Sequence, residues 1–389
     1  MTLILIRNAN LYAPQPLGIR HLLLGGGRIL WVGDEAFDLP VPLRAVSRIV
    51  DAAGRVTIPG LIDGHVHVTG GGGEAGFRTR VPALPLSRFT TAGITTVVGL
   101  LGTDDVARGP GELLATLYGL REEGLNAYGY AGGYHVPPAT LTGSVRGDLV
   151  FVEALIGIGE VAISDHRSSQ PTLDELLRIA SECHVAGVMT GKAGILHLHL
   201  GDGPRGLELI REALRTSELP ARVFNPTHVN RRRALFAEAL ELARQGCTVD
   251  ITAFPVAEGE DAYAAAEALE RYLAAGAPAD RVTISSDAGG CLPCFDAEGR
   301  VTHMDVGSSG ALLETLRAAL DRGLALEAAL PAFTTNPARL LRLTHKGSLA
   351  AGHDADLVML DESHRADTVV VRGEIHVIDR TCVRRGAFE

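Results

Sequence analysis

Both ends of the chain carry short runs in which apolar and polar residues alternate or β-branched residues gather, a pattern typical of β-strands. These runs cover residues 2–12, 22–24, 29–32, 356–360 and 368–371. Three glycines at 25–27 separate two of them, which indicates a hairpin. Because both ends are rich in strands, we expect residues 1–58 and 345–389 to combine into one small β-sandwich domain.

Between the ends, short apolar runs alternate with longer amphipathic ones, which is the pattern of βα units and a parallel sheet. The expected strands cover residues 61–68, 94–101, 127–135, 155–164, 195–200, 223–229, 248–254 and 282–286. The expected helices cover residues 111–123, 173–186, 206–216, 231–245, 262–275 and 309–322. This α/β pattern predicts a (β/α)8 TIM barrel over residues 59–344. A doubly wound open sheet is the alternative, but no glycine-rich nucleotide-binding motif follows the first strand.

Composition excludes several classes of protein. The chain is 46% hydrophobic, which is too apolar for a disordered protein, and its formal net charge is −10. An acidic chain lacks the basic surface to which nucleic acids and anionic membranes bind, so we expect neither as a partner. Five scattered cysteines form no disulfide framework, and no apolar run is long enough to span a membrane. A cytoplasmic protein is expected.

Ionisable residues gather at the carboxyl ends of the expected strands, where a barrel carries its active site. These residues are His65, His67, Glu160, His199, His228 and Asp287. Alone, each has an ordinary structural explanation, such as a hydrogen-bonded core histidine. Together they would be costly to bury, and one or two divalent cations would remove that cost. Imidazole and carboxylate ligands suit Zn²⁺, with Mn²⁺, Co²⁺ or Ni²⁺ as possible replacements.

A pair of metal ions would also supply a mechanism. Two cations that share a water lower its pKa and polarise a scissile carbonyl. Asp287 beside that water could take its proton and later deliver it to the leaving amine. The sequence therefore favours metal-assisted hydrolysis over redox or phosphoryl-transfer chemistry.

Longer motifs resemble the amidohydrolase superfamily, namely residues 59–67, Ser286-Asp287 and residues 352–358. More specific motifs, at residues 70–76, 98–104, 134–137, 142–145, 162–168 and 226–231, resemble the isoaspartyl dipeptidases of that superfamily. The resemblance covers nearly the whole chain. It implies hydrolysis of β-aspartyl (isoaspartyl) dipeptides by a metal-activated hydroxide, two Zn²⁺ ions per subunit, and a large homo-oligomer, an octamer.

The resemblance also assigns roles to the residues at the strand ends. His65 and His67 would hold one metal ion, with Asp287 nearby. His199 and His228 would hold the other ion. His197 lies on the same strand face as His199, but the position of His199 relative to the following Gly201-Asp202 makes it the better candidate.

Further roles concern the substrate. The resemblance implies that Glu74, on a glycine-rich loop, pairs with the α-ammonium group and that Tyr134 donates its hydroxyl to the developing oxyanion. A flexible loop and a core aromatic residue are the plain alternatives. Thr103 and the backbone near Gly72 would add hydrogen bonds.

Arg167 and Arg231 would each bind one substrate carboxylate in a bidentate fork. A dipeptide joined through an aspartyl side chain has two free carboxylates and one amine, so two arginines and one glutamate match its charges. For Arg231, a surface arginine at the start of a helix is the alternative.

Two positions depart from the family pattern. Glu160 stands where relatives carry a carboxylated lysine, and its side chain is roughly 3–4 Å shorter. The only lysines, Lys192 and Lys346, cannot replace it from their positions in the chain. We therefore predict a metal pair bridged by Glu160 and an activity that needs no bicarbonate. Cys291 stands where relatives carry a serine that contacts a substrate carboxylate, and its CxxC spacing with Cys294 is a weak signal.

The same residues are compatible with other functions. The main alternative is a cyclic amidase of the dihydroorotase or hydantoinase kind, and an N-acyl-D-amino acid deacylase is the next. A metal-free scaffold descended from such enzymes is a different class, but none of the expected ligand positions has been lost.

Overall fold

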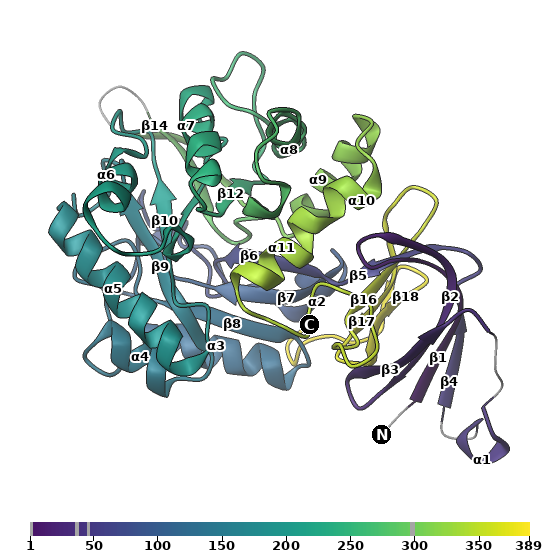
Figure 1. The fold of residues 1–389 in the computed structure, drawn as a ribbon. Coiled ribbons are helices and arrows are strands. Elements are labelled where there is room, and N and C mark those ends of the chain that lie inside the picture. Colours follow the sequence, from purple (N-terminus) through teal and green to yellow (C-terminus); the bar gives the residue numbers. More distant parts are fainter. Residues whose placement is uncertain (1–2, 36–38, 45–46, 296–299) are drawn as a thin grey trace.

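A curled parallel sheet forms the centre of the molecule (Figure 1). The computed structural model describes residues 3–35, 39–44, 47–295 and 300–389. The strands of this sheet, in chain order, are β6 (Leu61–Val66), β7 (Ile94–Gly99), β8 (Asn126–Ala131), β9 (Leu155–Ile163), β10 (Ile195–Leu200) and β11 (Phe224–Thr227). They pair in sequence order, so the sheet runs from β6 to β11.

A second parallel pair continues the order of the strands. It consists of β12 (Val249–Thr252) and β13 (Val282–Ser285). On one side the Val229 amide, beyond β11, donates to the Asp250 carbonyl in β12, 3.3 Å away. On the other side Val66 in β6 forms an isolated parallel bridge with Ala288, three residues beyond β13. All eight expected strands are thus present in the expected order, six in one sheet and two in a pair.

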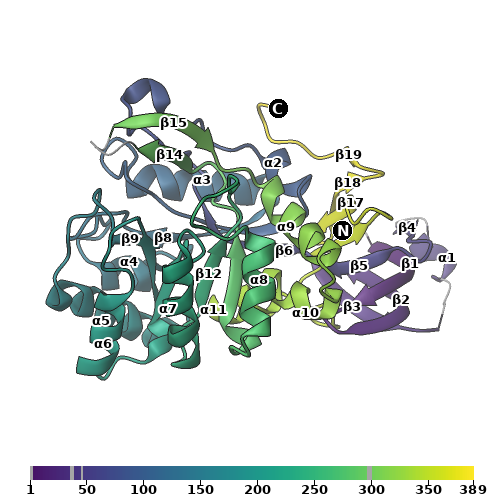
Figure 2. The same cartoon turned by 90° about the horizontal axis from the view of Figure 1, so that it is seen from above.

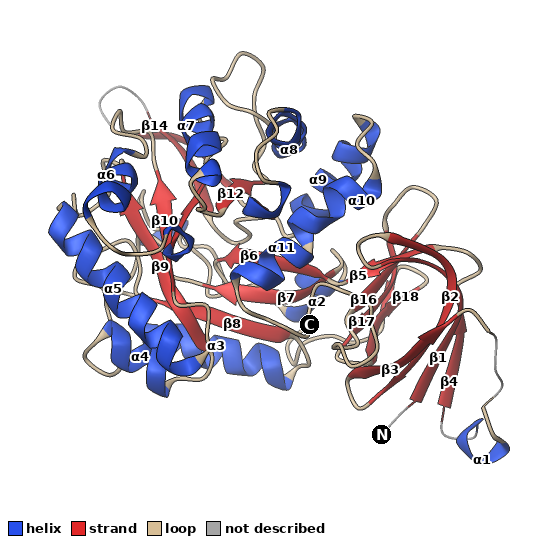
Figure 3. Cartoon of the chain, in the orientation of Figure 1, coloured by secondary structure: helices blue, strands red, loops and turns tan. Residues whose placement is uncertain are grey.

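Helices lie around the outside of these strands (Figure 3). They are α2 (Leu86–Thr90), α3 (Pro110–Glu122), α4 (Val145–Phe151), α5 (Leu173–Thr190), α6 (Glu208–Thr216), α7 (Arg233–Arg244), α8 (Ala265–Ala274), α9 (Gly310–Asp321), α10 (Leu326–Ala329) and α11 (Thr335–Leu340). Short 3-10 turns are η1 (Phe77–Thr79), η2 (Ala221–Val223), η3 (Ala279–Arg281) and η4 (Leu330–Phe333). The six expected helices are confirmed as α3 and α5–α9, whereas the short α2, α4, α10 and α11 were not expected. No helix among the described residues combines the length and apolar character needed to cross a membrane.

The two ends of the chain share one nine-stranded sheet, seen beside the central strands in Figures 1 and 2. Its strands are β1 (Leu3–Tyr12), β2 (Pro16–Gly25), β3 (Arg28–Gly33), β4 (Ser47–Asp51), β5 (Val56–Pro59), β16 (Leu357–Leu360), β17 (Ala366–Val371), β18 (Glu374–Ile378) and β19 (Thr381–Cys382), with the short α1 (Val41–Arg44) between β3 and β4. Antiparallel pairing of β5 with β16 joins the two ends. The expected hairpin is formed by β2 and β3.

A hairpin that the sequence did not predict follows β13. It consists of β14 (Cys291–Phe295) and β15 (Val301–Val306), which pair with each other and with no other strand of the described chain. The side chain of Cys294, the second cysteine of the CxxC spacing, lies outside the described residues. The hairpin matters because Cys291, Leu292, His303 and Asp305 line the cavity at the strand ends.

Candidate active site

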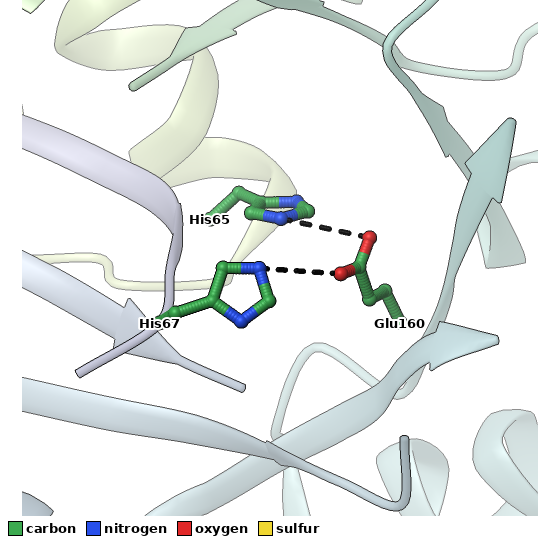
Figure 4. A group of neighbouring side chains, drawn as sticks. All are labelled: His65, His67 and Glu160. Carbon is green, nitrogen blue, oxygen red and sulfur yellow. Dashed lines mark ion pairs between the residues drawn. The ribbon is translucent and has the colours of Figure 1, made fainter. Parts of the chain in front are cut away.

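Glu160 lies at the centre of the ionisable residues that end the parallel strands (Figure 4). Its Oε2 atom is 3.0 Å from His199 Nδ1, 3.4 Å from His228 Nε2 and 3.6 Å from His65 Nε2. Its Oε1 atom is 3.3 Å from His67 Nε2. One carboxylate of β9 therefore contacts imidazoles from β6 and β10 and from the residues that directly follow β6 and β11.

Asp287 contacts two histidines of this group. Its Oδ1 atom is 3.2 Å from His67 Nε2 and 3.4 Å from His65 Nε2. Asp287 and His228 each follow a strand and have positive φ values, of 53° and 60°, which residues other than glycine rarely adopt. Such backbone conformations cost energy and are concentrated at functional sites, where they aim a side chain. We call the six residues the site cluster: His65, His67, Glu160, His199, His228 and Asp287.

The donor set of the site cluster fits one or two divalent cations. Its ligand atoms form three overlapping groups, which are His65, His67 and Glu160; His65, His228 and Asp287; and Glu160, His199 and His228. All six residues are at most 5% exposed. The buried atoms His65 Nε2 and Asp287 Oδ1 have no hydrogen-bond partner. A cation would satisfy these atoms and remove the cost of leaving them buried and unpaired.

The pKa values of the site cluster also indicate that its carboxylates require nearby positive charge. Burial lowers the pKa of His67, but the Asp287 and Glu160 carboxylates outweigh burial and raise that pKa to about 10. Burial raises the pKa of Glu160, but His65, His199 and His228 hold it well below its ordinary value. For His228, burial wins and the pKa lies well below the usual value. The two carboxylates thus stay ionised only beside positive charge, which a bound cation would supply.

His197 is buried next to the site cluster but belongs to none of the three ligand groups. Its Nε2 atom is 2.8 Å from His65 Nδ1, and its Nδ1 atom is 2.6 Å from Asn225 Oδ1. Burial, with the neighbouring His65, lowers the pKa of His197 to about 3, so this imidazole is neutral. The hydrogen bond to His65 fixes the orientation of that ring, as partners of metal-ligating histidines commonly do.

A cavity of about 610 Å³ opens over the site cluster and holds the expected substrate residues. Glu74 Oε1 accepts a hydrogen bond from Thr103 Oγ1 at 3.1 Å and lies 3.5 Å from a terminal nitrogen of Arg167. The other oxygen, Oε2, is buried without a hydrogen-bond partner. An oxygen of this kind in a cavity can accept a cationic group of a ligand.

The other residues expected to bind the substrate also line the cavity, and some of them form hydrogen bonds within the protein. The Tyr134 hydroxyl is 2.8 Å from His199 Nδ1, and burial raises its pKa well above the usual value, so it keeps its proton. Arg231 donates to the Leu200 carbonyl at 3.0 Å, which holds it beside the cavity rather than on the surface. At Gly72 φ is +81°, and a Cβ atom there would lie 2.3 Å from the Thr79 carbonyl oxygen. Burial raises the pKa of the Cys291 thiol to about 12, so this side chain stays neutral.

Asp165 is a buried residue of the cavity wall for which the sequence suggested no role. It contacts His199 and Arg167 at the same time. The only signal in the sequence was its place in the motif at residues 162–168, and spacing alone could not show which side chains it meets.

The two lysines lie apart from the site. Lys192 Nζ donates to the carbonyls of Leu149 and Val152, both at 2.6 Å. Lys346 Nζ pairs with Asp354 and Asp356, at 2.7 and 2.6 Å. A carboxylated lysine therefore has no place in the site cluster, and Glu160 occupies the centre.

Most of the chain matches the model of a known protein family. The model of the amidohydrolase family matches residues 56–376, which is most of the chain. The chain belongs to the amidohydrolase family. This family is generally metal-dependent, which agrees with the ligand groups of this amidohydrolase.

Solved structures and curated relatives refine the likeness. The beta-aspartyl dipeptidase of Fervidobacterium islandicum AW-1, in complex with beta-Asp-Leu dipeptide, is 42% identical to this amidohydrolase, with a TM-score of 0.91 and 98% of both chains covered. The imidazolonepropionase of Cereibacter sphaeroides is 27% identical over 374 residues, 89% of each chain. The imidazolonepropionase of Salinispora arenicola is 36% identical over 116 residues, which are 28% of this chain and 26% of that protein. The resemblance read from the motifs is thus confirmed.

Proposed function

We propose that this amidohydrolase hydrolyses β-aspartyl (isoaspartyl) dipeptides with bound metal ions. The observation that carries the proposal is the 42% identity, over 98% of both chains, with a beta-aspartyl dipeptidase in complex with beta-Asp-Leu dipeptide. Glu74, Arg167 and Arg231 line one cavity above the site cluster, which supplies the charges that such a substrate requires. The imidazolonepropionase likeness is weaker in identity, and a cyclic amidase or N-acyl-D-amino acid deacylase has no separate observation in its favour.

The site cluster would hold the metal ions, which we propose to be two Zn²⁺ per subunit, with Mn²⁺, Co²⁺ or Ni²⁺ as replacements. His65 and His67 would bind one ion and His199 and His228 the other. Glu160 contacts all four histidines, which supports a bridging role between the two ions. When bound, the ions would lower the pKa of a shared water and polarise the carbonyl of the scissile amide.

The chain's own residues would move the protons and stabilise the charge that develops. Asp287, buried at the floor of the cavity, would take the proton of the attacking water and pass it to the leaving amine. Tyr134 keeps its phenolic proton and would donate it in a hydrogen bond to the carbonyl oxygen as that oxygen gains negative charge.

Recognition would follow from matched charges. The unpaired Glu74 Oε2 atom is available for the α-ammonium group, while Thr103 holds the other oxygen of that carboxylate. Arg167 and Arg231 would bind the two carboxylates. The backbone at Gly72 would add a hydrogen bond, and Cys291 would contribute a weaker donor than the serine of relatives.

Several broader features belong to the same proposal. We expect the two parallel sheets to complete a (β/α)8 barrel at residues 59–344, and residues 1–58 and 345–389 to form the sandwich domain beside it. A homo-oligomer, an octamer by resemblance, and a cytoplasmic location are also expected.

A substrate panel tests the function. β-Asp-Leu, α-Asp-Leu, dihydroorotate and an N-acetyl-D-amino acid are offered with and without a chelator. We expect cleavage of β-Asp-Leu alone, abolished by the chelator and restored by Zn²⁺. Cleavage of a ring amide or of the N-acetyl amino acid in preference to β-Asp-Leu would refute the proposal.

The variant Glu74→Gln separates the candidate reactions further. It keeps the shape of the side chain and removes the charge that would pair with the α-ammonium group. We expect kcat/KM for β-Asp-Leu to fall by about 100-fold, as for a lost charge-assisted contact. A ring amide has no such group, so its hydrolysis should not depend on Glu74. Glu122→Gln, at an exposed position of α3, is the matched control.

A further inference from the structure

The carboxylate of Asp165 contacts two residues of the site that have different proposed roles, one in metal binding and one in substrate binding. Its Oδ2 atom is 2.9 Å from His199 Nε2 and accepts a hydrogen bond from an Arg167 terminal nitrogen at 2.8 Å. Its Oδ1 atom accepts from the Arg167 Nε group at 3.0 Å and from the Arg167 backbone amide at 2.7 Å. One buried side chain therefore contacts a proposed metal ligand and a proposed carboxylate-binding arginine.

The two nitrogens of His199 lie 2.8 and 3.2 Å from the Tyr134 hydroxyl, but they face different carboxylates. Nδ1 points to Glu160 and to the ligand group that contains His228, whereas Nε2 points to Asp165. A carboxylate on the second nitrogen of a metal-ligating histidine fixes the tautomer and the ring orientation, and it makes the ligating nitrogen more basic.

We propose that Asp165 is a positioning residue that holds His199 in place for a metal ion and Arg167 in place for a substrate carboxylate. This inference rests on the proposed function for the role of Arg167, whereas its link to His199 depends only on metal binding. Asp165 itself would touch neither the reacting atoms nor the substrate.

Packing supports this role. The Asp165 side chain is 1% exposed, so its hydrogen bonds are shielded from water. Gly201, which follows β10, lies against it so closely that a Cβ atom there would be 2.2 Å from Asp165 Oδ2. The absence of a side chain at Gly201 thus allows the carboxylate to reach His199 and Arg167 together.

A direct role as a metal ligand is the competing interpretation. Asp165, His166 and Asp202 also form a group of possible ligand atoms. However, His166 and Asp202 are exposed, and both Asp165 oxygens already accept hydrogen bonds from the Arg167 guanidinium. A cation placed there would face the positive charge of Arg167, so we assign Asp165 to positioning.

Asp165→Asn tests the proposal, because the amide keeps the shape but loses the charge and one acceptor. The zinc-loaded enzyme is titrated with a chelator, and KM and kcat for β-Asp-Leu are measured separately. We expect metal affinity to fall by about 10–100-fold. We expect KM to rise by about tenfold, with a smaller change in kcat.

A double variant separates the two effects. In an Arg167→Met background, Asp165→Asn should no longer raise KM, because the arginine that it positions is gone. The loss of metal affinity should persist in that background, because it acts through His199. A residue with a merely structural role would lower the melting temperature without this pattern.

Controls cover the other outcomes. Asp105→Asn removes a different buried carboxylate, which contacts His135 at 2.6 Å, and should leave metal affinity unchanged. If Asp165→Asn fails to fold, Gly201→Ala displaces the same carboxylate and should lower metal affinity in the same direction. Unchanged metal affinity and KM would overturn the inference, and so would loss of a metal ion in His166→Ala. If the wild type does not cleave β-Asp-Leu, the proposed function fails, while the chelator titration still tests the link to His199.

Discussion

Two clusters of charged residues in this protein differ in how many of their buried polar atoms have hydrogen-bond partners within the protein. The first is the site cluster. The second, which we call the junction cluster, consists of Lys346, Asp354, Asp356 and Asn126 and lies between the central strands and the terminal sheet. Asp356 accepts hydrogen bonds from Lys346 at 2.6 Å, Asn126 at 3.0 Å and the Arg372 backbone amide at 2.7 Å. Every oxygen of Asp356 thus has a partner from the protein.

The site cluster is the opposite case. His65 Nε2 and Asp287 Oδ1 are buried without a hydrogen-bond partner, although six ionisable residues meet there. A buried network that is complete stabilises a fold, whereas one that lacks partners loses stability unless a ligand supplies them. The comparison therefore assigns a structural role to the junction cluster and a binding role to the site cluster, and variants of equivalent residues can test this assignment.

The largest effect is expected at Asp287. Asp287→Asn keeps the volume and removes the group that would transfer the proton, so kcat for β-Asp-Leu should fall by about 10³-fold. Asp356→Asn is the matched change in the junction cluster and should lower the melting temperature with little effect on kcat. The assignment would be wrong if the two variants exchanged these results.

Metal content tests the central position of Glu160. Wild-type enzyme reconstituted without bicarbonate should bind about two metal ions per chain, and Glu160→Gln should bind about one or fewer, because the proposed bridge is lost. Metal content is measured by mass spectrometry and activity with and without added bicarbonate. Clearly fewer than two ions in the wild type, or an activity that requires bicarbonate, would contradict the Glu160 bridge.

The residues at the strand ends of the site could be predicted from the sequence, because several ionisable residues from apolar strands meet at one end of the expected barrel and would be costly to bury together. Period-two spacing placed His65 and His67 on one face, and both contact Glu160 in the structure. The same spacing could not separate His197 from His199. Only their depth along β10 does so, since His197 faces His65 and Asn225 whereas His199 reaches Glu160.

Loops and additional elements could not be predicted in the same way. Asp165 lies on a loop, and its contacts with Arg167 and His199 depend on how separate segments fold together. The β14–β15 hairpin has no counterpart in the repeating βα pattern, so it could not be expected beside the cavity. The helices α2 and α4 are too short to show a clear amphipathic period.

The junction cluster should respond in stability rather than activity. Lys346→Met leaves Asp356 buried beside Asp354 without the cation, which should lower the free energy of unfolding by about 3 kcal/mol. Burial lowers the pKa of Lys346, but Asp356 and Asp354 outweigh it, so the pKa lies above its ordinary value of 10.5. The ion pair therefore contributes fully below that pH, and its contribution is lost as the pH rises through the raised pKa.

Denaturant unfolding at pH 7.5 measures this loss, and Lys192→Met, which removes the other lysine, is the control. Metal content and kcat should stay at wild-type values in Lys346→Met. A variant that unfolds normally but loses metal would remove the distinction between the two clusters.

The smallest effect concerns His376 in β18, which is buried with both ring nitrogens unpaired and lies outside both clusters. Burial lowers its pKa from 6.5 to about 4, so the folded protein favours the neutral ring. The unfolded chain binds a proton at higher pH, so stability is complete above pH 6.5 and declines as the pH falls toward 4. The decline should reach about 2 kcal/mol at pH 5.

His376→Leu should reduce this pH dependence, as measured by denaturant unfolding at pH 7.5 and 5. His345→Leu, at an exposed position, is the control for removing an imidazole. An unchanged pH dependence would mean that His376 is not the residue that binds the proton on unfolding. The expected result would show that buried atoms without hydrogen-bond partners, taken alone, lower the stability of the fold. Such atoms indicate a binding site only where they meet carboxylates at a cavity.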